Sequence, residues 1–220
     1  MELNRYIDGA FLKPDGSYNH LIDYIELAEE YKIRGVCVLP NRIIEARDLV
    51  TSRFQDPRII GCLNFPFGSN INSIIESSIM SNAGINEIDY VVPLGILKDL
   101  SEDNRFFVSK FGWLEREILP IRSHVSIFKL IIEISLLTER MLKIVIDLAK
   151  HCNVSYIKTS TGVINTRPTT VGDIKKIISM TDNPIKASGG IKTREQALEL
   201  IDAGASIIGV SDFKKILEGE

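Results

Sequence analysis

The stretch Tyr156-Ile157-Lys158-Thr159-Ser160-Thr161-Gly162 joins a short apolar run to a lysine, three hydroxyl residues and a glycine. This is the pattern of a buried strand that ends in a turn. Burial disfavours the ammonium form of a lysine, so Lys158 needs either a partner for its charge or a chemical role. The flanking sequence repeats a similar unit, in which a short strand is followed by a longer helix.

Eight β-rich runs alternate with helical segments along the 220 residues. The predicted strands are 6–12, 35–39, 58–65, 87–92, 126–134, 155–159, 184–187 and 206–210. Helices are expected over 20–32, up to 50, and over 72–82, 102–121 (with a break suggested at Gly112), 138–150, 170–180, 193–203 and 212–217. The alternation predicts an α/β fold, a single (β/α)₈ TIM barrel over 1–220. An open doubly wound sheet is the alternative, but its Gly-x-Gly-x-x-Gly fingerprint is absent.

The amino-acid composition argues against several classes of function and location. The net charge is -3 and no basic face is visible in the sequence, which argues against a nucleic-acid partner. No apolar run approaches the roughly 20 residues that span a membrane, and no signal peptide is evident. The three cysteines, Cys37, Cys62 and Cys152, form no Cys-x-x-Cys pair and are interpreted as reduced thiols of a cytoplasmic protein.

Strand alternation predicts charged side chains inside the barrel. In the run 126–134, Phe128, Leu130 and Ile132 share the parity that suits the helix-facing side, so the other parity points inward. Applied to each strand, this logic gives an inward set of three acids and three lysines: Asp8, Asp89, Glu133, Lys129, Lys158 and Lys186. Six charges can balance as a structural ion-pair network, but such networks add little stability over apolar packing, and a reactive site is the stronger interpretation.

The two lysines Lys158 and Lys186 lie on consecutive predicted strands, which are about 4.8 Å apart in a sheet. Two close ammonium groups lower each other's pKa, and a neutral lysine amine forms a Schiff base with a carbonyl. Asp89 is then the candidate proton shuttle, and Lys129 a residue that positions it. This chemistry needs no metal or cofactor, and the scattered histidines His20, His124 and His151 suggest no histidine-rich site.

The run Ala187 to Thr193 contains Gly189, Gly190 and Lys192 and leads into a predicted helix. Glycine amides beside a helix start can bind an anion, and barrels often hold phosphate after strands seven and eight. Ser211 follows the eighth strand. An ordinary glycine turn explains the same residues equally well, and the carboxylate of Asp212 would repel a phosphate unless it only caps the last helix.

The chain resembles the deoxyribose-phosphate aldolase family nearly end to end. The resemblance is carried by Ile157 to Gly162 and by Lys186 to Thr193, with support from 36–38, 64–68, 87–89 and 129–133. It implies a TIM-barrel class I aldolase that reversibly cleaves 2-deoxy-D-ribose 5-phosphate to D-glyceraldehyde 3-phosphate and acetaldehyde. Dimers are frequent in this family, so a homodimer is a further expectation.

The resemblance implies roles for single residues. Lys158 matches the Schiff-base lysine, Lys186 the lysine that lowers its pKa, and Asp89 the aspartate of the proton relay. It implies substrate-binding positions at Lys129, Asp8, Cys37, Thr161, Gly189, Gly190, Lys192 and Ser211.

The sequence departs from the family pattern at three places. Gly9-Ala10 replaces a His-Thr pair, Asp212 replaces a serine, and Arg167 lies in a loop that is often glycine-rich. Two other functions therefore stay open. One is a Schiff-base aldolase with another, unphosphorylated acceptor aldehyde. The other is a non-catalytic barrel that binds sugar phosphates.

Overall fold

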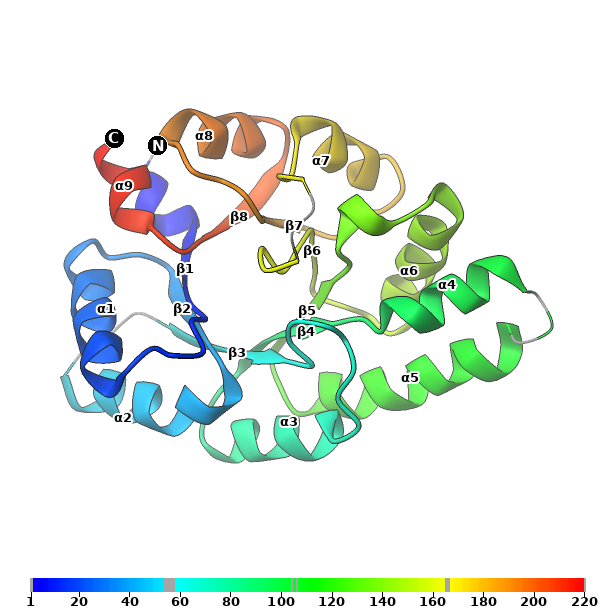
Figure 1. The fold of residues 1–220 in the computed structure, drawn as a ribbon, viewed down its shortest axis with the longest axis horizontal. Helices are drawn as coiled ribbons and strands as arrows, with labels where there is room; N and C mark the ends of the chain where they lie inside the picture. Colours follow the sequence, from blue (N-terminus) through cyan, green and yellow to red (C-terminus); the bar gives the residue numbers. More distant parts are fainter. Residues whose placement is uncertain (1, 54–57, 104, 106, 165–166, 220) are drawn as a thin grey trace.

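The computed structural model describes residues 2–53, 58–103, 105, 107–164 and 167–219. Its strands close into one parallel barrel in chain order, with β8 paired to β1, so the predicted (β/α)₈ fold is confirmed. The strands are β1 Ile7–Phe11, β2 Gly35–Val38, β3 Arg58–Leu63, β4 Glu87–Val91, β5 Ile127–Ile131, β6 Tyr156–Lys158, β7 Ile185–Ser188 and β8 Ala205–Val210. Figure 1 shows the strands at the centre of a ring of helices.

The helices cover the outside of the barrel, and the two chain ends lie near each other beside α9 and α8 (Figure 1). They are α1 Tyr18–Glu30, α2 Ile43–Arg53, α3 Ser73–Asn82, α4 Leu94–Glu102, α5 Phe107–Ser123, α6 Glu139–His151, α7 Val171–Ile178, α8 Arg194–Asp202 and α9 Phe213–Glu218. Short 3-10 turns occupy Leu3–Tyr6, Pro40–Arg42 and Ile134–Leu136. Within the described residues, no helix has the length and hydropathy needed to cross a membrane.

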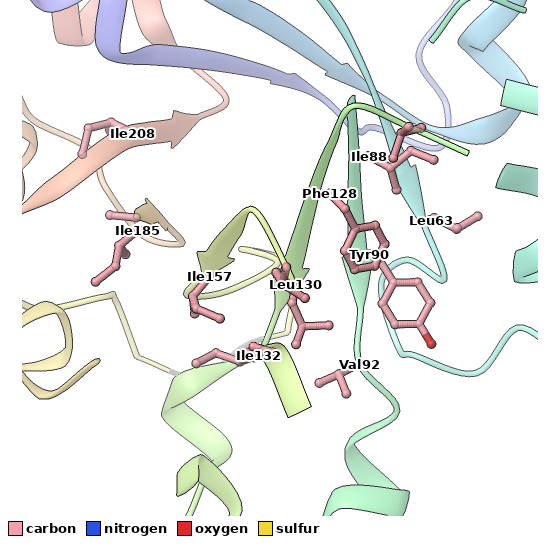
Figure 2. Packing of buried hydrophobic residues seen from close by; sticks show 14 of the residues in the cluster. Leu63, Ile88, Tyr90, Val92, Phe128, Leu130, Ile132, Ile157, Ile185 and Ile208 are labelled. Carbon is pink, nitrogen blue, oxygen red and sulfur yellow. The ribbon is translucent and has the colours of Figure 1, made fainter. Parts of the chain in front are cut away.

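The main apolar core lies between the strands and the helices. Ile88, Tyr90 and Val92 and the β5 residues Phe128 and Leu130 all belong to it, as strand alternation predicts. Figure 2 shows these side chains grouped beside β4 and β5, with Tyr90 and Phe128 next to each other. Their ring centroids are 5.8 Å apart. Because the apolar parity faces outward, the other parity of these strands is left to fill the barrel interior.

Side-chain caps mark the residues at which several helices begin. Thr138 and Thr193, where the sequence predicts two helices to begin, are the N-caps of α6 and α8, and Gln196 completes a capping box at α8. Asp212 is the N-cap of α9, where its Oδ1 accepts a hydrogen bond from the Lys215 amide. A side-chain cap satisfies an amide that has no partner inside the helix.

The region after β4 differs from the prediction. Pro93 is followed at once by α4, which the sequence analysis missed, and α5 begins only at Phe107. Gly112 lies inside α5 and does not break it; a Cβ there would meet only the Glu115 side chain, at 3.9 Å. A glycine inside a helix weakens it by about 1 kcal/mol but does not end it when the packed face continues.

Candidate active site

The carboxylate of Asp89 lies at the centre of the barrel and contacts three lysines. Its Oδ1 accepts a hydrogen bond from Lys129 Nζ at 2.9 Å. Its Oδ2 accepts from Lys158 Nζ and from Lys186 Nζ, each at 2.8 Å. Strand pairing explains the geometry, since Asp89 is opposite Lys129 on β4 and β5, and Lys158 is opposite Lys186 on β6 and β7. The sequence prediction that these four side chains share the interior is confirmed.

A second layer of charges surrounds this centre. Asp8 Oδ2 lies 2.7 Å from Lys186 Nζ, and Asp8 Oδ1 accepts from Arg34 at 2.6 Å. Arg34 also donates to Glu87, and Glu87 forms an ion pair with Lys129. The network therefore runs around the barrel interior without a break, from Asp8 on β1 to Lys186 on β7.

Two glycines make room for this network. A Cβ at Gly35 would stand 3.3 Å from Asp8 Oδ1 and 3.0 Å from a main-chain oxygen on β3. A Cβ at Gly209 would stand 3.2 Å from Lys186 Cε and 3.0 Å from Ser188 Cβ. Both separations are tighter than side-chain carbons normally accept, so the absent side chains leave the space that Asp8 and Lys186 occupy.

Charges in this network do not balance when every group is ionised. Among the described residues it contains four cations and three carboxylates, which are Arg34, Lys129, Lys158, Lys186, Asp8, Glu87 and Asp89. Unmatched charge is costly in a buried site, so the extra cation makes this network less favourable than a balanced one. A lysine is the kind of cation here that can lose its proton, because a guanidinium stays protonated.

Lys158 is the lysine of the network with the fewest carboxylate contacts. It contacts one carboxylate, whereas Lys129 and Lys186 each contact two. It is also the one of the three with any exposure, 3% against 0% for each of the other two. Lys158 is the last residue of β6, so it stands at the carboxyl end of the barrel, where barrel enzymes hold their active sites.

The pKa values correct one prediction. Burial lowers the pKa of Lys158 and Lys186 lowers it further, but the attraction of Asp89 contributes to a net increase. The pKa of Lys186 is raised well above its usual value, because Asp8 and Asp89 together outweigh the effect of burial. Lys186 does lower the pKa of Lys158 as expected, but the expectation that both lysines have a lowered pKa is wrong for the resting site, where the carboxylates dominate. Burial opposes ionisation of Asp89, yet the three lysines hold its pKa well below the usual range.

The placement of Glu133 among the lysines is a second correction. Strand β5 ends at Ile131, and Glu133 adopts a left-handed backbone with φ 49° at the start of a 3-10 turn. Its Oε2 accepts hydrogen bonds from the Thr161 amide at 3.0 Å and from Thr161 Oγ1 at 2.7 Å. Glu133 is buried as predicted, but it fixes the loop after β6 instead of pairing with a lysine of the network.

The predicted binding residue Cys37 contacts Lys186 and Asp89. Lys186 Nζ donates to its Sγ at 3.3 Å, and the same sulfur is 3.8 Å from Asp89 Oδ2. A hydrogen bond from Cys62 lowers the pKa of the Cys37 thiol. Cys37, Cys62 and Cys152 are all buried and unpaired, which agrees with their interpretation as reduced thiols.

Glycine turns occupy the predicted phosphate end. Gly189 and Gly190 both have positive φ, 94° and 72°, and a Cβ on either would collide with Ser160 or Pro168. Lys192 and Ser211 follow β7 and β8 and therefore stand at the same end of the barrel as Lys158. Arg167, which lies in the loop that departs from the family pattern, donates two hydrogen bonds to the carboxylate of Asp173.

Two residues of the network were missed from the sequence. Glu87 shares the parity of Asp89 on β4, so strict alternation would have found it. Arg34 precedes β2, and its amide donates to the Ile7 carbonyl. No pattern of alternation reports the direction of a side chain just outside a strand, so Arg34 gave no signal.

The curated proteins that are similar to this chain share one name. No protein-family model matches the chain. Curated relatives named deoxyribose-phosphate aldolase align over nearly the whole length. The one from Thermococcus kodakarensis is 34% identical over 99% of this chain and 96% of its own. The one from Finegoldia magna is 33% identical over 100% of both chains.

Solved structures agree with the fold. An aldolase named QR15 superposes with a TM-score of 0.86 at 29% identity, covering 99% of this chain and 95% of that one. The deoxyribose phosphate aldolase of Aeropyrum pernix, described as tetrameric, gives a TM-score of 0.85 over 98% and 89% of the two chains. Its identity of 24% supports the fold alone.

Proposed function

This chain belongs to the deoxyribose-phosphate aldolase family, and from that premise we propose that it cleaves 2-deoxy-D-ribose 5-phosphate reversibly to D-glyceraldehyde 3-phosphate and acetaldehyde. The observation that carries the proposal is the contact of one buried carboxylate, Asp89, with three lysines, of which only Lys158 has any exposure. This arrangement provides a nucleophile and an adjacent proton acceptor.

Lys158 is the proposed nucleophile. A proton passes from its ammonium to a water beside Asp89 and on to solvent, which removes the unmatched charge of the network. The amine nitrogen then attacks the substrate aldehyde carbon, and loss of water gives an imine. Removal of the proton from the C3 hydroxyl breaks the C2–C3 bond. D-glyceraldehyde 3-phosphate leaves, and an enamine of acetaldehyde stays on Lys158 until C2 is protonated and water releases the product.

The other network residues position these groups. Lys186 keeps its proton, because Asp8 and Asp89 hold its pKa well above the usual value. Lys129 contacts Glu87 and Asp89, so the two lysines hold Asp89 from two sides. Asp8 and Cys37 are buried behind Lys186, so their proposed effect on the substrate passes through that lysine. Thr161 stands three residues beyond Lys158 in a loop that Glu133 fixes, which suits contact with a substrate hydroxyl.

Substrate phosphate is proposed to bind at Gly189, Gly190, Lys192 and Ser211. The engagement of Asp212 as the cap of α9 supports this site, because its Oδ1 is then occupied by a backbone amide. We expect kcat/KM to be at least about tenfold higher for 2-deoxyribose 5-phosphate than for 2-deoxyribose, since a charge-assisted hydrogen bond contributes about 1.5–3 kcal/mol. Lys192→Gln should reduce the difference. Equal rates on both sugars would favour the alternative, an aldolase with an unphosphorylated acceptor.

Helix α3 supplies a surface for the proposed homodimer. Ile75 and Ile79, four residues apart on α3, are 62% and 57% exposed, and Ile74 is 39% exposed; Ile71, two residues before the helix, is 93% exposed. The one charged residue of α3 is Glu76. An uncharged apolar face is complementary to its own copy, because a two-fold axis brings no like charges together. Antiparallel pairing of two α3 helices would bring Ile75 near that axis.

We expect Ile75→Glu to convert a dimer to a monomer in sedimentation or light-scattering measurements, raising the dissociation constant at least about 100-fold. Two glutamates would meet near the axis. The matched control is Val108→Glu on α5, which changes another exposed apolar residue, 86% exposed, away from α3. A wild-type chain that is monomeric at all concentrations, or a dimer that Ile75→Glu leaves intact, would contradict this interface.

We also propose a cytoplasmic location. Three buried thiols without a disulfide support it, since such cysteines are typical of a reducing compartment.

A further inference from the structure

The hydroxyl of Tyr24, on α1, lies in a space that β1 leaves open at Gly9. A Cβ at Gly9 would stand 2.8 Å from Tyr24 Oη, which is closer than packed atoms normally approach. Gly9 follows Asp8, whose side chain lies inside the barrel, so strand alternation turns position 9 toward the helices. The missing side chain at Gly9 therefore admits the Tyr24 hydroxyl between β1 and the helix layer.

Aromatic contacts hold the ring of Tyr24 in place. Its centroid is 5.5 Å from that of Phe11 on β1 and 5.2 Å from that of Phe213 on α9. The contact with Phe213 is edge-to-face, with 82° between the ring planes, which is a favoured arrangement. Burial raises the pKa of the Tyr24 phenol, so the hydroxyl keeps its proton at neutral pH and can donate it to a hydrogen bond. Three elements, α1, β1 and α9, therefore determine where this donor lies.

The Tyr24 hydroxyl donates a hydrogen bond to the main-chain carbonyl of Ser211, at 3.0 Å. Strand β8 ends one residue before Ser211, at Val210, which pairs with Gly9. Ser211 itself is exposed, so packing contributes little to its placement. The hydrogen bond therefore ties the first residue after β8 to the helix layer.

Ser211 comes at the level of the glycine turn that follows β7. Ser188 is opposite Gly209, and continuing this register by two residues places Ser211 next to Gly190. Ser211 also continues the parity of Gly209, which faces the barrel interior because Gly209 pairs with Asp8. Its φ is not positive, so the alternation is not interrupted there. The Ser211 side chain is thus turned toward the end of the barrel where substrate phosphate is proposed to bind.

We propose that Tyr24 is a positioning residue for the substrate phosphate, and that it acts by holding Ser211. The hydrogen bond fixes the main chain at position 211 before the substrate arrives, so less ordering of an exposed loop opposes binding. Tyr24 lies on the helix side of β1, so the reacting carbon atoms are out of its reach. This inference rests on the proposed aldolase function and on its phosphate site.

Tyr24→Phe removes the hydroxyl and keeps the ring. We expect KM for 2-deoxyribose 5-phosphate to rise about three- to tenfold, the ratio that corresponds to one neutral hydrogen bond, with kcat unchanged. Turnover of 2-deoxyribose, which has no phosphate, should not change. Tyr31→Phe is the matched control, because it removes a hydroxyl that contacts Glu218 in the last turn of α9, and it should leave all these values at the wild-type level.

A second variant displaces the hydroxyl without removing it. Gly9→Ala places a methyl carbon 2.8 Å from Tyr24 Oη, so the hydroxyl has to move and KM should rise by a similar factor. Adding Gly9→Ala to Tyr24→Phe should raise KM little further, because both changes break the same hydrogen bond. Effects on KM that multiply in the double variant would contradict the inference.

Binding of inorganic phosphate, measured by calorimetry, separates this inference from the proposed function. Tyr24→Phe should weaken phosphate binding about three- to tenfold and Tyr31→Phe should not, whether or not the chain cleaves the sugar. No phosphate binding by the wild type, or equal binding by wild type and Tyr24→Phe, would overturn the role of Tyr24 even in an active aldolase. Phosphate binding that depends on Tyr24 in a chain unable to cleave 2-deoxyribose 5-phosphate would refute the aldolase alone.

Discussion

Lys158→Met should abolish turnover of 2-deoxyribose 5-phosphate, with a loss of at least about 10⁴-fold, because no other lysine of the network has any exposure. Borohydride with acetaldehyde should add a two-carbon mass to Lys158 in the wild-type chain and to no residue in the variant. The variant should fold normally. It removes the unmatched positive charge, and Asp89 retains Lys129 and Lys186 as partners.

A companion variant separates the two buried lysines. Lys186→Met should slow the reaction while the adduct on Lys158 still forms, because Lys186 positions Asp89 and is not the proposed nucleophile. An adduct on Lys186 in the wild type would refute the assignment. If Lys158→Met kept the cellular function intact, the non-catalytic sugar-phosphate-binding barrel would be the better description.

Asp89→Asn should have the second largest effect, on both stability and turnover. The amide cannot accept a proton in the relay, so turnover should fall by about 10²–10⁴-fold. Three lysines would lose their shared carboxylate, and breaking a buried ion pair by removing one partner costs about 3–5 kcal/mol. Chemical denaturation measures the stability, and Asp182→Asn, an exposed aspartate, is the control.

The same variant changes the dependence on pH. The pKa of Asp89 is held well below its usual value in the folded chain. Its contribution to stability is therefore complete above the unfolded pKa of about 3.9 and is lost only as pH falls toward the lower folded value. Asp89→Asn should remove this part of the acid dependence.

Lys158 also responds to Asp89→Asn. Attraction by Asp89 raises the pKa of Lys158, and without it burial and Lys186 both lower that pKa. Imine trapping on Lys158 in Asp89→Asn should therefore extend to lower pH than in the wild type, even though turnover falls. Unchanged turnover and an unchanged trapping profile would exclude Asp89 from the relay.

Much of the site follows from strand alternation. The parity of Ile88, Tyr90 and Phe128 placed Asp89 and Lys129 inside the barrel, because successive side chains of a strand point to opposite faces. The same rule failed at Glu133, because a left-handed residue ends the period-2 pattern. A single positive φ at a non-glycine residue leaves no mark in the sequence, so this break could not be foreseen.

The charge balance of the network could be determined only from the tertiary structure. Arg34 lies outside the strands, yet it joins Asp8 to Glu87 across β1 and β4. With Arg34 included, cations exceed carboxylates by one, whereas the sequence suggested three against three. The direction of the lysine pKa shifts also could not be predicted from the sequence. It depends on which carboxylates lie within 3 Å of each ammonium group and not on how many charges face inward.

The run from Tyr156 to Gly162 determined, by itself, that a lysine ends a buried strand, and the eightfold repetition around it determined the barrel. Only the closed barrel decided how many carboxylates each lysine contacts. Closure of the barrel pairs β1 with β8, which is the neighbour of β7, and so places Asp8 beside Lys186. On the other side of the barrel, Glu87 on β4 lies beside Lys129 on β5. Lys158 is left with one carboxylate. That difference depends on contacts between strands far apart in the chain, which local sequence patterns do not encode.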